Sequence, residues 1–325
     1  MDFVRRLEAE EILIPRFQRN YVWSIREASR FIESLLLGLP VPGIFLANEP
    51  QTNKQLVIDG QQRLKTLQFF RSGFFNPKPE EKKQGVFALQ KVQKAFSGKT
   101  YATLQERDRR RLDNSIIPAT IVKQLAPSGS DTSLYHIFER LNSGGRKLTA
   151  QEIRVAIYHG PLINSVHNLN SYESWRKIFG KINPRLKDQE MILRFLALYY
   201  GAERYKRPMS EFVNAFAGSH RDPGPAFLKG AEQAFKNVID LVYSALGAVA
   251  FRPERAINAA VFDSVMVGLA RKLETDSHPE PSGVKKAYRK LLQQKDYQEK
   301  VSRSTADEAF VKARLASATR AFREL

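Results

Sequence analysis

One change in the pattern of hydrophobic residues constrains the fold of this chain more than any other feature. Up to about Val122, short β-rich runs alternate with amphipathic helices, whereas from about Thr132 onward helices follow one another with short polar loops between them. Such a division between a strand-containing region and a helical region favours an α+β protein. We therefore expect an α/β domain in residues 1–125 and a mainly α-helical domain in residues 126–325.

The strands of the first domain are predicted from short apolar runs at residues 11–14, 44–47, 55–58 and 116–122. Pro118 lies inside the last run, which predicts an edge strand there because proline cannot donate to a central ladder. Helices are predicted over residues 25–37, 60–71 and 104–112. In the second domain they are predicted over residues 131–141, 188–200, 208–216, 225–246, 256–272, 283–294 and 304–322. Thr149 opens a further helix, since Glu152 follows it at capping-box spacing.

The amino-acid composition excludes several kinds of chemical site and favours one kind of partner. The chain has no cysteine, which excludes a disulfide scaffold, a thiolate zinc site, an iron–sulfur cluster and a cysteine nucleophile. It has 52 Lys and Arg against 34 Asp and Glu, a net charge of +18, which favours acidic partners such as nucleic acid, nucleotides or anionic lipid. No signal peptide and no membrane-length apolar run is found, so a cytoplasmic protein without a membrane partner is expected.

The segment from Val57 to Leu64, VIDGQQRL, is predicted to turn directly from a strand into a helix. A helix start presents backbone N–H groups to an anion, and Gly60 lets a ligand approach the main chain closely. Arg63 lies one turn into the helix and can bind the same anion through its guanidinium fork. Asp59 can hold Mg²⁺ or orient a water. The alternative is a structural one, in which Asp59 is a helix N-cap with Gln62 as its capping-box partner.

Two other segments have unusual side chains. Residues 14–23, IPRFQRNYVW, interleave basic, amide and aromatic groups, which can hold phosphate and stack a base; as separate residues, Phe17 and Trp23 are better explained as core anchors. Residues 138–149, FERLNSGGRKLT, place Glu139 and Asn142 three apart on one helix face, where their oxygens can bind a metal ion. Taken alone, the last segment is better explained as a helix C-cap followed by a capped helix.

Together these segments resemble the N-terminal domain of the GmrSD type IV restriction enzymes. The resemblance is carried, in order, by Ile14 to Trp23, by Gly38-Leu39-Pro40-Val41-Pro42, by Val57 to Leu67 and by Phe138 to Glu152. It implies a ParB/sulfiredoxin-like core, a small mixed sheet with helices, followed by a helical extension whose start, residues 131–160, completes the site.

The resemblance also implies a nucleoside triphosphate (NTP) site with Mg²⁺. The catalytic residues would be Asp59, Gln61, Gln62 and Arg63, and the metal ligands Asp59 and Glu139. The implied nucleotide-binding residues are Gln18, Arg19, Tyr21, Trp23, Gly60, Thr66, Asn142 and Gly145.

The chain departs from the family in one respect. Full-length GmrSD-like enzymes carry a C-terminal H-N-H nuclease domain, which needs a histidine general base. The five histidines here form no such pattern, so we expect no H-N-H nuclease in this chain and a separate partner nuclease. Residues 170–210 and 280–325 each carry an excess charge of +5, which indicates either a solvated surface or a groove for the DNA backbone.

The leading hypothesis is therefore an NTP-hydrolysing sensor or regulatory subunit of a prokaryotic anti-phage restriction system that acts on DNA. One alternative is a DNA- or nucleotide-binding module that recruits a nuclease without turnover. Another is a ParB-like nuclease. A homo-oligomer is compatible with each of these.

Overall fold

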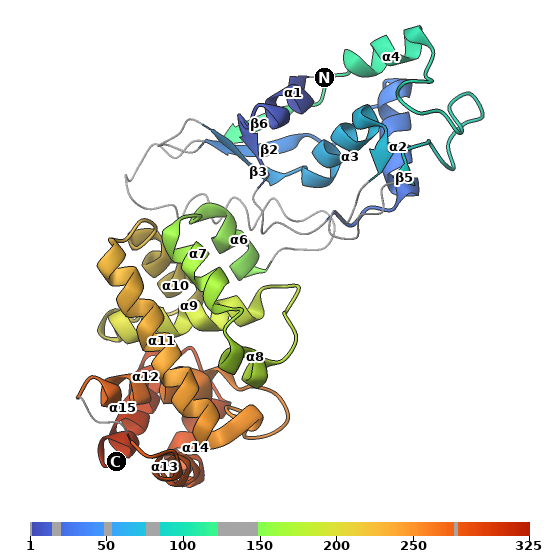
Figure 1. Cartoon of the computed structure of the whole chain (residues 1–325). Coiled ribbons are helices and arrows are strands. Elements are labelled where there is room, and N and C mark those ends of the chain that lie inside the picture. Colours follow the sequence, from blue (N-terminus) through green and yellow to red (C-terminus); the bar gives the residue numbers. More distant parts are fainter. Residues whose placement is uncertain (1, 15–20, 49–53, 76–84, 123–148, 276–278) are drawn as a thin grey trace. The chain divides into compact units, whose positions relative to one another are not determined.

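The computed structural model describes residues 2–14, 21–48, 54–75, 85–122, 149–275 and 279–325 (Figure 1). The described residues fall into two compact units, one up to residue 122 and one from residue 149 onward. The first contains a small mixed sheet and the second is helical, so the predicted α+β class is confirmed. The predicted boundary at residues 125 and 126 lies outside the described residues and stays a prediction.

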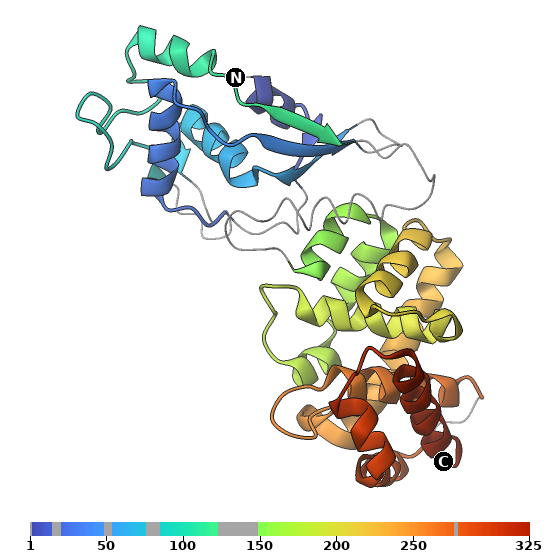
Figure 2. The same cartoon turned by 180° about the vertical axis from the view of Figure 1, so that it is seen from behind.

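The first unit is built on a four-stranded sheet whose order is β1-β3-β2-β6. Its strands are β1 (Ile12–Leu13), β2 (Ile44–Asn48), β3 (Gln55–Asp59) and β6 (Ala119–Val122). Strand β3 runs parallel to β1 and antiparallel to β2, and β2 runs parallel to β6. Figure 2 shows β6, in blue-green, alongside β2. Strand β6 ends the order, as Pro118 predicted, and it begins only after the proline.

Helices α2 (Ile25–Leu37) and α3 (Gln61–Ser72) supply much of the core of the first unit. The helix predicted at residues 25–37 has these bounds because Ser24 forms a capping box with Glu27 and Gly38 ends the helix in the left-handed conformation, with φ +71°. The unit also contains α1 (Asp2–Glu8), α4 (Glu106–Asp113) and a two-stranded ribbon of β4 (Phe74–Phe75) and β5 (Gly85–Val86).

The second unit consists of helices joined by short loops. They are α6 (Ala150–Ile157), α7 (Pro161–Leu169), α8 (Glu173–Phe179), α9 (Lys187–Gly201), α10 (Met209–Ser219), α11 (Pro225–Leu246), α12 (Ala259–Leu273), α13 (Pro281–Gln293), α14 (Lys295–Ser302) and α15 (Glu308–Arg323), with 3₁₀ turns η2 (Ala202–Arg204) and η3 (Gly247–Val249). The capping box of Thr149 and Glu152 is confirmed. The predicted helix at residues 131–141 lies outside the described residues.

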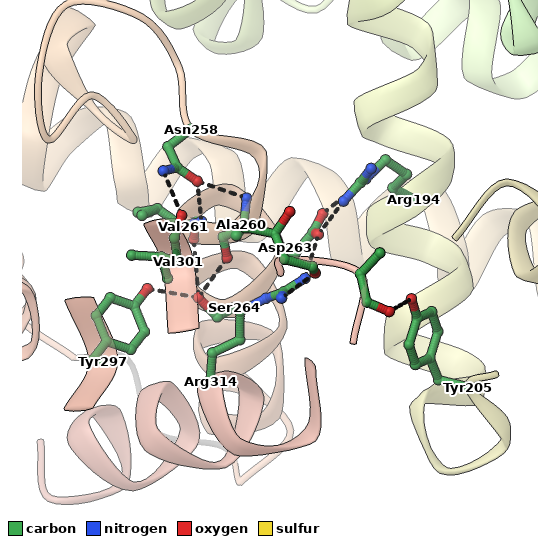
Figure 3. A network of polar contacts seen from close by, with 12 residues as sticks. Arg194, Tyr205, Asn258, Ala260, Val261, Asp263, Ser264, Tyr297, Val301 and Arg314 are labelled. Carbon is green, nitrogen blue, oxygen red and sulfur yellow. Dashed lines mark hydrogen bonds and ion pairs between the residues drawn. The ribbon is translucent and has the colours of Figure 1, made fainter. Parts of the chain in front are cut away.

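Helix α12 runs through the middle of the second unit, and most of its residues are buried. A Cβ on its Gly268 would lie 2.9 Å from the main chain of Ala318, so only glycine allows α15 this close an approach. Buried Asp263 of α12 accepts hydrogen bonds from Arg194 of α9 and Arg314 of α15 (Figure 3). One carboxylate therefore joins three helices of this unit. No helix among the described residues is long and apolar enough to cross a membrane.

Candidate functional site

The predicted turn between a strand and a helix is present: β3 ends at Asp59 and α3 begins at Gln61. The pairing of β2 with β3 shifts register here, since Phe45 pairs with Asp59 but Leu46 pairs with Val57. This bulge adds one residue to β3 and ends the strand at Asp59.

Gly60 joins β3 to α3 with a φ of +102°, a conformation that L side chains rarely adopt. A Cβ placed on Gly60 would also lie 2.4 Å from Cγ2 of Ile44 on β2. From the sequence, the predicted role of Gly60 is to let a ligand approach the main chain closely. The structure supplies a further reason, which is the close packing of the turn against β2.

Asp59 and Arg63 form an ion pair across the turn. Nη2 of Arg63 lies 2.6 Å from Oδ2 of Asp59 and donates a second hydrogen bond of 3.0 Å to the carbonyl of Gly43. The Arg63 side chain is 14% exposed and that of Asp59 is 44% exposed. Nε of Arg63 is buried and finds no hydrogen-bond partner in the described part of the chain. The guanidinium is thus held inside the turn, while the carboxylate stays accessible to solvent.

The alternative role for Asp59, as the N-cap of α3, is wrong. The N-cap is Gly60, and no side chain of a described residue caps this helix start. The helix therefore keeps the partial positive charge of its N-terminus available to an anion. Arg63 adds a full positive charge to the same turn. Asp59 offsets that charge within the ion pair, so the positive field beside Gly60 comes mainly from the start of the helix, next to the accessible carboxylate.

Gln62 joins this turn to the first unusual segment. Its Oε1 accepts hydrogen bonds from the backbone N–H groups of Val22, at 2.9 Å, and Trp23, at 3.3 Å. One turn later, the hydroxyl of Thr66 lies 2.6 Å from that of Tyr21 and donates to the carbonyl of Gln62 at 2.7 Å. The structure therefore brings residues 21–23 and the DGQQR turn together, and Gln62 and Thr66 both make the connection.

The aromatic rings of this segment are held by the protein. Tyr21 is 5% exposed and packs edge-to-face on Phe69 and Phe75, with ring centroids 5.0 and 5.7 Å apart. Burial raises the pKa of Tyr21 to about 12. Trp23 packs edge-to-face on Phe31 and lies against the hydrophobic core. Trp23 is thus a core anchor, as its structural explanation predicted, and a base would reach the Tyr21 ring only if the segment moved.

Lys65 is a cation near the turn that sequence reasoning missed. It follows Gln61 by one helical turn, so the two side chains share a face of α3. Lys65 is partly buried, burial lowers its pKa, and within the described part of the chain it has no ion pair. The i, i+4 spacing from Gln61, which is itself buried, was the signal that could have found it. The carbonyl of Gly43 was also missed, although it directly follows the predicted Pro40-Val41-Pro42 run.

The other predicted site residues lie outside the described residues: Gln18, Arg19, Glu139, Asn142 and Gly145. Their roles stay predictions, as does completion of the site by residues 131–160. Of the two predicted metal ligands, only Asp59 lies in the described part, where its carboxylate offers a solvent-accessible oxygen.

The part of the chain that contains the DGQQR turn matches a known protein family. Residues 2–159 match the model of the GmrSD restriction endonuclease, N-terminal domain. The match spans the first unit and includes the DGQQR turn. Searches of curated proteins and of solved structures gave no significant match. Residues 2–159 of this chain therefore belong to the family of GmrSD restriction endonuclease N-terminal domains.

Proposed function

We propose that this protein binds and hydrolyses a nucleoside triphosphate at the turn between β3 and α3, as a sensor or regulatory component of a restriction system that acts on DNA. The observation that carries the proposal is the ion pair of Asp59 and Arg63 at a helix start that no side chain caps. The family of residues 2–159 supports the restriction context.

The residues of the turn fit a polyphosphate. The first turn of α3 presents the backbone N–H groups of Gln62 and Arg63, next to Gly60. The buried Nε of Arg63 has no partner among the described residues, so it is a donor for which an anion would be a suitable acceptor. Lys65 adds positive charge to the same helix.

The residues also fit one Mg²⁺ ligand, the accessible carboxylate of Asp59. When bound, the ion would neutralise phosphate charge. Asp59 orients the attacking water or holds the metal ion, and Arg63 neutralises charge that develops on the phosphate oxygens as the bond to the leaving group breaks. Gln62 keeps residues 22 and 23 beside the turn through its two backbone hydrogen bonds.

DNA would bind outside this turn, through the positive charge of the helical unit, and the nuclease step would belong to a partner protein. Nucleotide hydrolysis would then report DNA binding to that partner. This division of roles follows from the chemistry of the turn, which binds an anion, and from the diffuse excess of cations elsewhere.

The test is phosphate release by the purified protein with Mg²⁺ and each of the four common NTPs. We expect Asp59→Asn to lower turnover by at least about 100-fold. Glu106→Gln is the matched control, because Glu106 forms an i, i+4 ion pair with Arg110 in the same unit but away from the turn. Full turnover in Asp59→Asn would contradict the proposal.

Two other outcomes identify the alternatives. NTP binding in calorimetry without phosphate release by wild-type protein would select the non-hydrolysing binding module. Metal-dependent nicking of DNA that is lost in Asp59→Asn would select the ParB-like nuclease.

A further inference from the structure

Helix α13 presents a face of four cations, Lys285, Lys286, Arg289 and Lys290. All four side chains are exposed. They are spaced i, i+1, i+4 and i+5, which places them together on one side of the helix. Residues 281–290, PSGVKKAYRK, contain no acidic residue. We call these four residues the α13 basic face.

No ion pair neutralises the α13 basic face within the described part of the chain. The other basic segment, residues 170–210, behaves differently. Five of its nine cations form ion pairs inside the helical unit: Arg176, Lys177, Arg185, Arg194 and Lys206. Two segments with the same excess of charge in the sequence therefore differ in the structure, and α13 offers the more available positive charge.

The opposite side of α13 is not available to a partner. Val284, Tyr288 and Leu291 are buried, where α13 packs on α11, α14 and α15. An amphipathic helix that binds a lipid surface inserts its apolar face between the headgroups. Because α13 has already buried that face within the protein, it can offer a partner only its charge.

We propose that the α13 basic face binds the sugar–phosphate backbone of duplex DNA. From Lys285 to Lys290 the helix rises by about 7.5 Å, whereas phosphates of one strand follow one another every ~3.4 Å along the DNA axis. The four side chains thus match about two to four phosphates. Such contacts neutralise charge without reading base edges, so binding is independent of sequence and sensitive to salt. This inference rests on the proposed function in taking DNA as the ligand.

The test measures binding of the full chain to a labelled duplex by fluorescence anisotropy over a series of salt concentrations. The variant replaces all four residues of the α13 basic face: Lys285→Gln, Lys286→Gln, Arg289→Gln and Lys290→Gln. Glutamine keeps the helix propensity and removes the charge. We expect affinity at low salt to fall by about tenfold or more, and the slope of log K against log salt to fall by about 2 to 4.

The matched control removes the same charge from exposed cations of residues 170–210 that form no ion pair with a described residue: Lys181→Gln, Lys187→Gln, Arg204→Gln and Arg207→Gln. A much smaller loss in this control supports the proposal. An equal loss in both variants overturns it, since total charge then explains the binding. Wild-type protein that binds no duplex also overturns it, as does binding to phosphatidylserine vesicles in place of DNA.

The same samples separate this inference from the proposed function. Phosphate release without DNA is measured for each variant, and the α13 variant should keep the wild-type rate. DNA binding that depends on α13 in a protein without NTP hydrolysis would support the inference while the proposed hydrolysis fails. NTP hydrolysis, together with DNA binding that the α13 variant does not weaken, would support the proposed function and overturn this inference.

Discussion

Nη2 of Arg63 lies 2.6 Å from Oδ2 of Asp59, across the turn in which left-handed Gly60 joins β3 to α3. The same nitrogen donates to the carbonyl of Gly43, so one guanidinium links the end of β3 to the residue before β2. Both of these contacts use Nη2, so in the proposed site Nε is a donor that a phosphate would bind, beside the carboxylate of Asp59.

Arg63→Lys keeps the charge but removes the guanidinium fork, which makes two hydrogen bonds here. We expect NTP affinity in calorimetry to fall by about tenfold or more, because lysine has no counterpart of Nε, the donor proposed for the phosphate, beside the nitrogen that binds Gly43 and Asp59. Stability should change by only about 0–1 kcal/mol, since Asp59 is nearly half exposed and the charge of residue 63 is kept. Arg71→Lys, in the last turn of the same helix, is the control and should bind NTP as the wild type does. Unchanged affinity in Arg63→Lys would remove Arg63 from the site.

Gly60→Ala should destabilise the first unit by roughly 2–5 kcal/mol, from left-handed backbone strain and from the clash with Ile44. Gly73→Ala separates the two causes, because Gly73 has a φ of +82° at the other end of α3 and nothing within 4 Å of its would-be Cβ. It should cost about 1–2 kcal/mol. Urea unfolding followed by tryptophan fluorescence measures both, and equal costs would mean that Ile44 yields without penalty.

Tyr21→Phe should lower stability at neutral pH by about 0.5–1.5 kcal/mol, because it removes the hydrogen bond to Thr66. The pKa of Tyr21, raised by burial to about 12 from its ordinary 10, adds a pH dependence. The folded state holds the proton more tightly, so this contribution is complete below pH 10 and is lost as pH rises towards 12. Wild-type protein should lose about 2–3 kcal/mol over this window through Tyr21, and Tyr21→Phe should lack that loss. Urea unfolding at several alkaline pH values tests this, and parallel pH profiles for the two proteins would contradict it.

Asp263→Asn should destabilise the helical unit by about 3–5 kcal/mol, because it leaves the guanidinium groups of Arg194 and Arg314 without their buried counter-charge (Figure 3). Burial lowers the pKa of Arg314, which indicates that solvent does little to compensate this charge. Thermal unfolding followed by circular dichroism measures the change. Asp240→Asn is the control, since the exposed carboxylate of Asp240 accepts from Tyr172 and Ser174 without a buried counter-charge, and this change should cost about 1 kcal/mol or less. A similar small cost for Asp263→Asn would show that the network adds little to stability.

The elements found from the sequence are those with strong local signals. Helix α2, whose residues Ala28, Phe31, Ile32, Leu35 and Leu36 are buried on one face, was predicted with its observed bounds. Four short helices, α1, α7, α8 and α14, were missed, because seven to nine residues hold too few hydrophobic repeats to show a period. Helix α12 begins at Ala259, three residues after its predicted start, because Asn258 caps it.

The sequence by itself determined the turn at Asp59 and Gly60, its place between a strand and a helix, and the family to which residues 2–159 belong. These depend on local backbone preferences and on a contiguous motif. Only the tertiary structure decided which groups the side chains of this turn bind. Arg63 pairs with Asp59 and donates to the carbonyl of Gly43, and Gln62 accepts from the backbone N–H of Val22, 40 residues earlier. The tertiary structure also decided which cations form ion pairs, because an ion pair depends on which helices pack together and not on the charge along the chain.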